Sequence, residues 1–127
     1  MDLVEEKSSL RVLLVPGFLD KIGRMKGMAH YLQTCGWQAT VISPQPSDGW
    51  VGIEVLAHSL AEMIDAALPE EQPLALVGFS MGGLICRYYV QYIDQGRRTE
   101  QLITLSAPHH GTYTAYLFDR PAPLQMR

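Results

Sequence analysis

Residues 74–83 read Leu-Ala-Leu-Val-Gly-Phe-Ser-Met-Gly-Gly, and this stretch decides the fold. It opens on a short apolar run that is typical of a buried strand, and from Met81 onward the apolar spacing becomes helical. A strand that turns into a helix within so few residues leaves little room for side chains, which explains Gly78 and Gly82 on either side of Ser80. The pattern is the G-x-S-x-G nucleophile elbow, which exposes a serine hydroxyl on a strained turn. Ser80 is therefore the candidate nucleophile.

Strand and helix patterns alternate on both sides of this turn. The expected strands are residues 10–15, 37–43, 74–78 and 102–105, and the expected helices are residues 24–35, 53–68 and 81–94. Beyond Pro108 the chain reads as a loop with one helical turn near residues 113–118. The strands are continuous apolar runs, as expected where both faces are covered. The order predicts an α/β fold, with a parallel sheet of about four strands and three crossover helices.

The composition is that of an ordinary globular domain. Of the 127 residues, 47% are hydrophobic and 18% are charged, and the formal net charge is −3. This length suffices for one domain with a buried core, so we expect a single domain over residues 1–127. The basic residues are scattered, and Arg97-Arg98 is the only adjacent pair, which we expect in a solvated loop. The chain therefore lacks the electrostatic signature of a nucleic-acid-binding protein.

The cysteines and the termini restrict the class of protein further. Cys35 and Cys86 are too few for a disulfide framework and have no metal-ligand spacing, so both are expected to be small buried side chains. The first ten residues lack the apolar core of a signal peptide, and no window reaches 18 apolar residues. We therefore expect a cytoplasmic protein with no transmembrane segment and no metal.

The carboxyl ends of the strands are the expected site, since ligands of open parallel sheets bind there. Three segments share that edge: residues 16–20, 78–82 and 106–112. A serine that attacks an ester carbonyl creates an oxyanion, which needs preorganised hydrogen-bond donors. One candidate donor is the backbone N–H of Met81, at the positive end of a helix. Gly17 lines the site and allows the backbone to approach closely, which makes the N–H of Phe18 the second candidate donor.

Three stretches together carry a family resemblance. They are Leu14-Val15-Pro16-Gly17-Phe18, Val77-Gly78-Phe79-Ser80-Met81-Gly82-Gly83 and Thr104-Leu105-Ser106-Ala107-Pro108-His109-His110-Gly111-Thr112. With these, residues 10 to about 118 resemble the α/β-hydrolase superfamily and, more narrowly, the bacterial triacylglycerol lipases and esterases. That group carries an HG-type oxyanion loop, a GxSMGG elbow and a T-L-x-x-P-H-x-G-T segment. Pro16 stands where many members have histidine, but the donor is the backbone N–H of the following residue.

The resemblance implies a serine hydrolase that cleaves carboxylic esters through an acyl-enzyme. In this reading Ser80 is the nucleophile, Phe18 and Met81 are the oxyanion donors, and His109 and His110 line the site. The substrate would be a small-molecule or lipid ester, and the reaction needs no cofactor. Acyl transfer to another acceptor would use the same nucleophile.

The acid and the general-base histidine of this family come after further strands. Only 47 residues follow Ser80, so we expect a chain that is truncated at its C-terminus and that is weak or inactive alone. We also expect residues 102–105 to form an open edge of the sheet, through which the chain can self-associate. Two alternatives remain. The chain is a minimal enzyme with His109 or His110 as base and Asp119 as a conceivable acid, or it is a non-catalytic relative that binds a ligand or a partner.

Overall fold

One sheet forms the middle layer of the computed structural model, which describes residues 9–17, 22–44, 52–105 and 115–119. Its strands are β1 (Arg11–Val15), β2 (Gln38–Val41), β3 (Leu74–Phe79), β4 (Thr99–Leu105) and β5 (Ala115–Asp119). They lie in the order β2-β1-β3-β4-β5. The first four strands run parallel, and β5 runs antiparallel to β4. The predicted parallel sheet is confirmed, and it carries one further strand.

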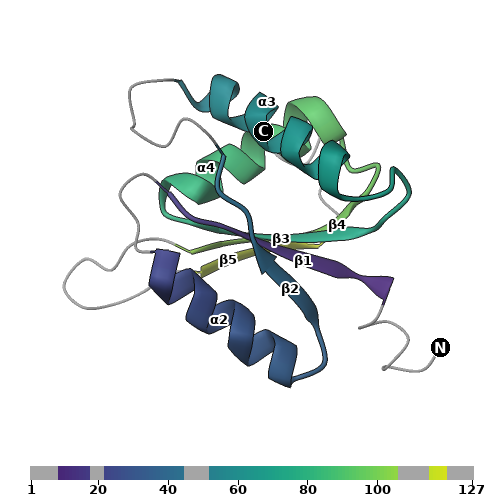
Figure 1. Cartoon of the computed structure of the whole chain (residues 1–127). Helices are drawn as coiled ribbons and strands as arrows, with labels where there is room; N and C mark the ends of the chain where they lie inside the picture. Colours follow the sequence, from purple (N-terminus) through teal and green to yellow (C-terminus); the bar gives the residue numbers. More distant parts are fainter. Residues whose placement is uncertain (1–8, 18–21, 45–51, 106–114, 120–127) are drawn as a thin grey trace.

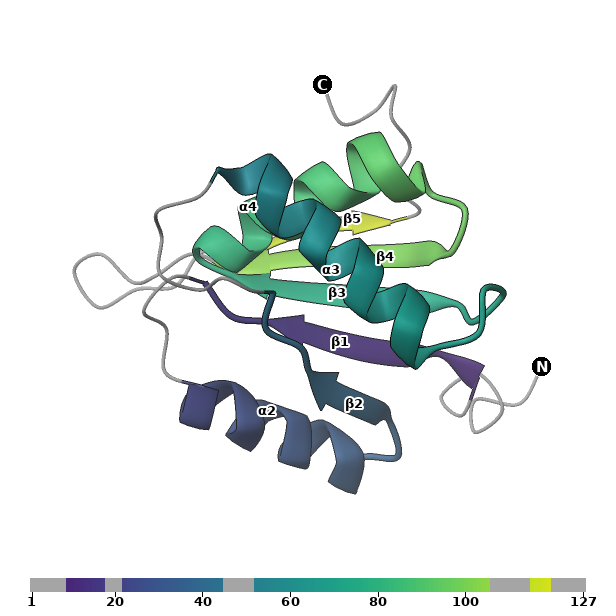
Figure 2. The same cartoon turned by 45° about the horizontal axis from the view of Figure 1, so that its top comes forward.

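Helices cover both faces of this sheet (Figures 1 and 2). The helix α2 (Ile22–Thr34) packs on one face, and α3 (Ile53–Ala67) and α4 (Met81–Tyr88) pack on the other. α4 continues into a π-helical turn, η1 (Tyr89–Asp94). Each helical segment joins two parallel strands, which confirms the three predicted crossovers. Within the described segments, no helix is both long enough and apolar enough to cross a bilayer.

The central strand β3 is buried along its whole length. Its side chains alternate between two apolar clusters because successive residues of a strand point to opposite faces. Leu74 and Leu76 pack toward α3 and α4, and Ala75, Val77 and Phe79 pack toward α2. Burial on both faces accounts for the continuous apolar run that marks this strand in the sequence. Packing on both faces therefore fixes the position of β3, which ends one residue before Ser80.

Residues 115–119 correct two expectations. They form the strand β5, so the helical turn predicted near residues 113–118 is wrong. The run Tyr116-Leu117-Phe118 consists of aromatic and apolar residues, which favour a strand when a free edge lies beside them. The expected open edge at residues 102–105 is wrong for the same reason, since β5 pairs with β4 from Gln101 to Leu105. Self-association was predicted through that edge, which β5 covers.

A buried polar network lies at the amino end of β4, at the end of the sheet away from Ser80. Asp94 is 1% exposed, and its carboxylate accepts hydrogen bonds from the backbone N–H groups of Arg98 and Thr99 at 3.0–3.3 Å. The Arg98 guanidinium donates to the carbonyl oxygens of Pro69 and Gln72. Arg98 is 7% exposed, so the prediction that it lies in a solvated loop is wrong. Its hydrogen bonds to carbonyl groups compensate for its burial.

The two cysteines differ in environment. Cys86 is buried in the cluster beneath α4, as predicted, whereas Cys35 is exposed just beyond the end of α2. Burial raises the pKa of the Cys86 thiol above its ordinary value. The thiol therefore stays protonated at neutral pH and does not compete as a nucleophile.

We predict that Asp94→Ala lowers the free energy of unfolding by about 2–4 kcal/mol, because it leaves two buried N–H groups without their acceptor. Asp65→Ala is the matched control. Asp65 is paired with Arg98 at 3.3 Å, but its side chain is 71% exposed, so its removal is expected to cost less than about 1 kcal/mol. Urea unfolding of the two variants measures both values. Equal losses would show that the carboxylate of Asp94 has no special role.

Candidate active site

Ser80 sits at the junction of β3 and α4 in a strained backbone conformation. Its φ is 58° and its ψ is −122°, a region that residues with a side chain rarely adopt. The backbone N–H of Ser80 donates to the carbonyl oxygen of Leu105 at 2.6 Å, and its own carbonyl accepts from the N–H of Gly83 at 2.9 Å. Its hydroxyl makes no capping bond to α4. The backbone is therefore held on both sides while the hydroxyl is not used to cap the helix.

The glycines around Ser80 are required by sterics. A Cβ atom at Gly78 would lie 2.5 Å from the carbonyl oxygen of Gly82 and from the Cα atom of Gly83. A Cβ atom at Gly82 would collide with the carbonyl oxygen of Val15 in β1. All of these neighbours are backbone atoms, which cannot move aside as a flexible side chain does. The first turn of α4 thus packs directly on the ends of β3 and β1.

This packing brings Gly17 and Met81 to one edge of the sheet. Val15 pairs with Gly78 across the sheet, so Gly17, two residues further on, lies beside the start of α4. Met81 is the first residue of α4, and the first N–H groups of a helix have no acceptor within the helix. The N–H of Met81 is therefore available at the positive end of the helix dipole. Phe18, the other predicted donor, lies outside the described residues.

A small pocket opens between these elements. It is lined by Pro16, Gly17, Ser43, Pro44, Leu56, Met81 and Ile85. Gly17 and Met81 were predicted at this edge, but the contribution of Ser43 and Pro44 was missed. They follow β2, and the rule that ligands bind at the carboxyl ends of parallel strands also applies to that strand. Residues 43–44 therefore add a segment to this edge. Of the predicted segments, residues 18–20 and 106–112 lie outside the described residues.

The candidate bases His109 and His110 and the candidate acid Asp119 have different outcomes. His109 and His110 lie outside the described residues, so their roles stay predictions. Asp119 pairs with Gln101 near the amino end of β4, and Ala115 pairs with Leu105 at the site edge. Four residues along the strand separate Asp119 from that edge, about 13 Å at ~3.3 Å per residue. The antiparallel register therefore removes Asp119 as a candidate acid.

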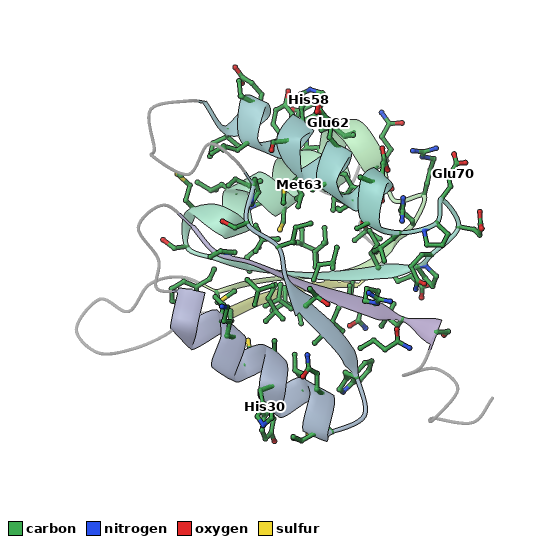
Figure 3. The ribbon with its side chains drawn as sticks, viewed as in Figure 1. His30, His58, Glu62, Met63 and Glu70 are labelled. Atoms are coloured by element: carbon green, nitrogen blue, oxygen red, sulfur yellow. The ribbon has the colours of Figure 1, made fainter. Side chains whose placement is uncertain are left out.

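The two described histidines do not face Ser80. His30 is exposed on α2, and His58 is exposed on α3, on the opposite side of the sheet (Figure 3). The ring of His58 lies 6.4 Å from the ring of Tyr88, the last residue of α4. Met81 begins that helix, seven residues earlier, which is about 10 Å at ~1.5 Å per residue. Neither histidine is therefore a candidate for the general base.

We predict that Gly82→Ala lowers the free energy of unfolding by about 3 kcal/mol, because the new methyl group overlaps backbone atoms of β1. Gly27→Ala is the matched control. A Cβ atom at Gly27 has no neighbour within 4 Å, and the residue lies inside α2, so alanine is expected to stabilise the protein by about 0.5–1 kcal/mol. Chemical denaturation checks both signs. A Gly82→Ala protein as stable as the parent would contradict the packing described above.

The similarity to known proteins agrees with this geometry. An extracellular α/β-hydrolase from a Paenibacillus species, described as sharing structural and functional homology with tobacco salicylic acid binding protein 2, has a similar structure. Its TM-score is 0.58 at 22% sequence identity, and the similarity covers 79% of this chain and 42% of that one. The chain thus spans less than half the length of that hydrolase. No curated protein sequence matches the chain.

The α/β fold expected from the sequence is therefore confirmed, and it is similar to the fold of an α/β-hydrolase. The family model for palmitoyl protein thioesterase matches residues 11–124, which is most of the chain. The protein belongs to the palmitoyl protein thioesterase family.

Proposed function

We propose that the protein hydrolyses acyl thioesters or the related carboxylic esters through a covalent acyl-enzyme on Ser80. The observation that carries the proposal is the backbone of Ser80, with φ of 58° at the first turn of α4. Strain of this kind costs about 1–3 kcal/mol and persists where the surrounding structure holds it in place. Membership of the palmitoyl protein thioesterase family favours a thioester over the triacylglycerol esters expected from the sequence.

In the proposed reaction, the Ser80 oxygen attacks the carbonyl carbon of the substrate. The developing oxyanion is stabilised by the N–H of Met81, by the positive end of the α4 dipole, and by the N–H of Phe18. The general base takes the Ser80 proton and passes it to the leaving group, so that the tetrahedral intermediate collapses, expels the thiol or alcohol and leaves an acyl group on Ser80. Water then attacks the acyl-enzyme and releases the carboxylic acid.

A serine hydroxyl needs a general base to react in this way. His109 and His110 are the candidates within the sequence, because the segment that carries them follows β4, the neighbour of β3. The alternative is that the base is supplied from outside residues 1–127. Substituting each histidine in turn distinguishes these cases.

We predict that the chain is labelled by a fluorophosphonate probe at Ser80 and hydrolyses a p-nitrophenyl or thioacyl ester, and that Ser80→Ala removes both properties. A protein without its nucleophile retains only the contribution of the oxyanion site, a loss of about 10³-fold or more. Ser59→Ala on α3 is the matched control, because it removes the same hydroxyl away from the elbow. Mass spectrometry of the labelled peptide and initial rates provide the measurements.

The histidine variants complete the test. A loss of labelling in His109→Ala or His110→Ala identifies that residue as the base, whereas labelling retained in both assigns the base to another group. Hydrolysis that survives Ser80→Ala would contradict the proposal. Absence of both labelling and hydrolysis in the parent chain would agree with a base supplied from outside residues 1–127 or with the non-catalytic, ligand-binding alternative.

A further inference from the structure

Met81 is the residue next to the candidate nucleophile, and its side chain forms part of the pocket wall. The side chain is half-buried and packs against the apolar cluster beneath α3 and α4. Leu56 and Ile85, each 2% exposed, line the same pocket from α3 and α4. Met81 therefore lines the pocket together with mainly apolar groups and is not fully buried.

The other described methionines lie elsewhere. Met25 is 1% exposed inside the cluster beneath α2, which shields its sulfur from solutes. Met28 is half-buried on α2, and Met63 is half-buried on α3, where Figure 3 labels it. Neither lines the pocket beside Ser80. Among the described methionines, Met81 thus combines solvent access with a position at the site.

We propose that Met81 is an oxidation site at which peroxides inactivate the enzyme. The inference rests on the function proposed for Ser80. A peroxide transfers one oxygen atom to the Met81 sulfur, so the O–O bond breaks and an S–O bond forms. For hydrogen peroxide the second oxygen leaves as water. The sulfur loses two electrons to the peroxide, and the product is methionine sulfoxide.

The sulfoxide changes the pocket in two ways. It converts an apolar side chain into a polar one, which is unfavourable against Leu56 and Ile85. It also places a strong hydrogen-bond acceptor in a pocket bordered by Gly17 and by the start of α4. That acceptor competes with the substrate oxyanion for the same backbone N–H groups. Loss of one oxyanion donor lowers kcat by about 10²–10³-fold, so an effect of this size is expected.

The experiment treats the purified chain with hydrogen peroxide and compares three proteins, the parent, Met81→Leu and Met63→Leu. Leucine is close to methionine in volume and cannot be oxidised at this position. Each protein is measured against its own untreated activity, and peptide mass spectrometry gives the oxidised fraction of each methionine. Cys35 is exposed in all three proteins, so its oxidation affects them equally.

We expect the parent and Met63→Leu to lose about 100-fold in activity as Met81 sulfoxide accumulates, and Met81→Leu to keep most of its own activity. An equal fractional loss in Met81→Leu would overturn the proposal. So would full activity in a parent whose Met81 is oxidised, or oxidation of Met28 and Met63 ahead of Met81. If the parent has no activity before treatment, that result bears on the proposed function instead, and the order of methionine oxidation still tests whether Met81 is the preferred site.

Discussion

The close approach of α4 to the ends of β1 and β3 is the constraint on which the rest of the structure depends. The helix begins one residue after Ser80, so its first turn must lie against two strand ends at once. Only hydrogen atoms fit where Gly78 and Gly82 face backbone carbonyl groups. The same approach brings Met81 and Gly17 to the wall of one pocket. The glycines thus serve the packing, which brings the start of α4 to the carboxyl ends of β1 and β3.

The fold was largely readable from the sequence because its signals are local. The predicted helices and strands between residues 10 and 105 all exist, and their ends differ from the structure by no more than three residues. The exception is the helix predicted over residues 81–94, which changes from α-helix to π-helix after Tyr88. The spacing of apolar residues does not distinguish these two kinds of helix over so short a segment. The strained conformation of Ser80 was also predicted, because flanking glycines are a local requirement of a tight strand-to-helix turn.

Features that depend on distant partners could not be read in this way. Arg98 was predicted to be solvent-exposed, because its acceptors at Pro69 and Gln72 are distant in sequence and are backbone carbonyl groups. The pairing of β5 with β4 follows from a free strand edge, which no local pattern encodes. The distance of Asp119 from the site depends on the direction of that strand. Ser43 and Pro44 reach the pocket only because β2 lies beside β1.

The two ends of β4 are coupled through its register with β3. The pairing steps from Leu74–Thr99 to Ala75–Gln101, so Glu100 is an extra residue at the amino end. The buried carboxylate of Asp94 holds this end by binding the N–H groups of Arg98 and Thr99, and the carbonyl of Arg98 accepts from the N–H of Leu74 at 2.7 Å.

Beyond the extra residue, Thr104 faces α4, where a Cβ atom at Gly83 would meet the Thr104 Cβ at 3.1 Å. A slip by one residue would turn Ile103 or Leu105 toward that face, and these larger side chains do not fit beneath the first turn of α4. It would also move the Leu105 carbonyl away from the N–H of Ser80. The polar network at one end of the sheet therefore helps to hold the elbow at the other.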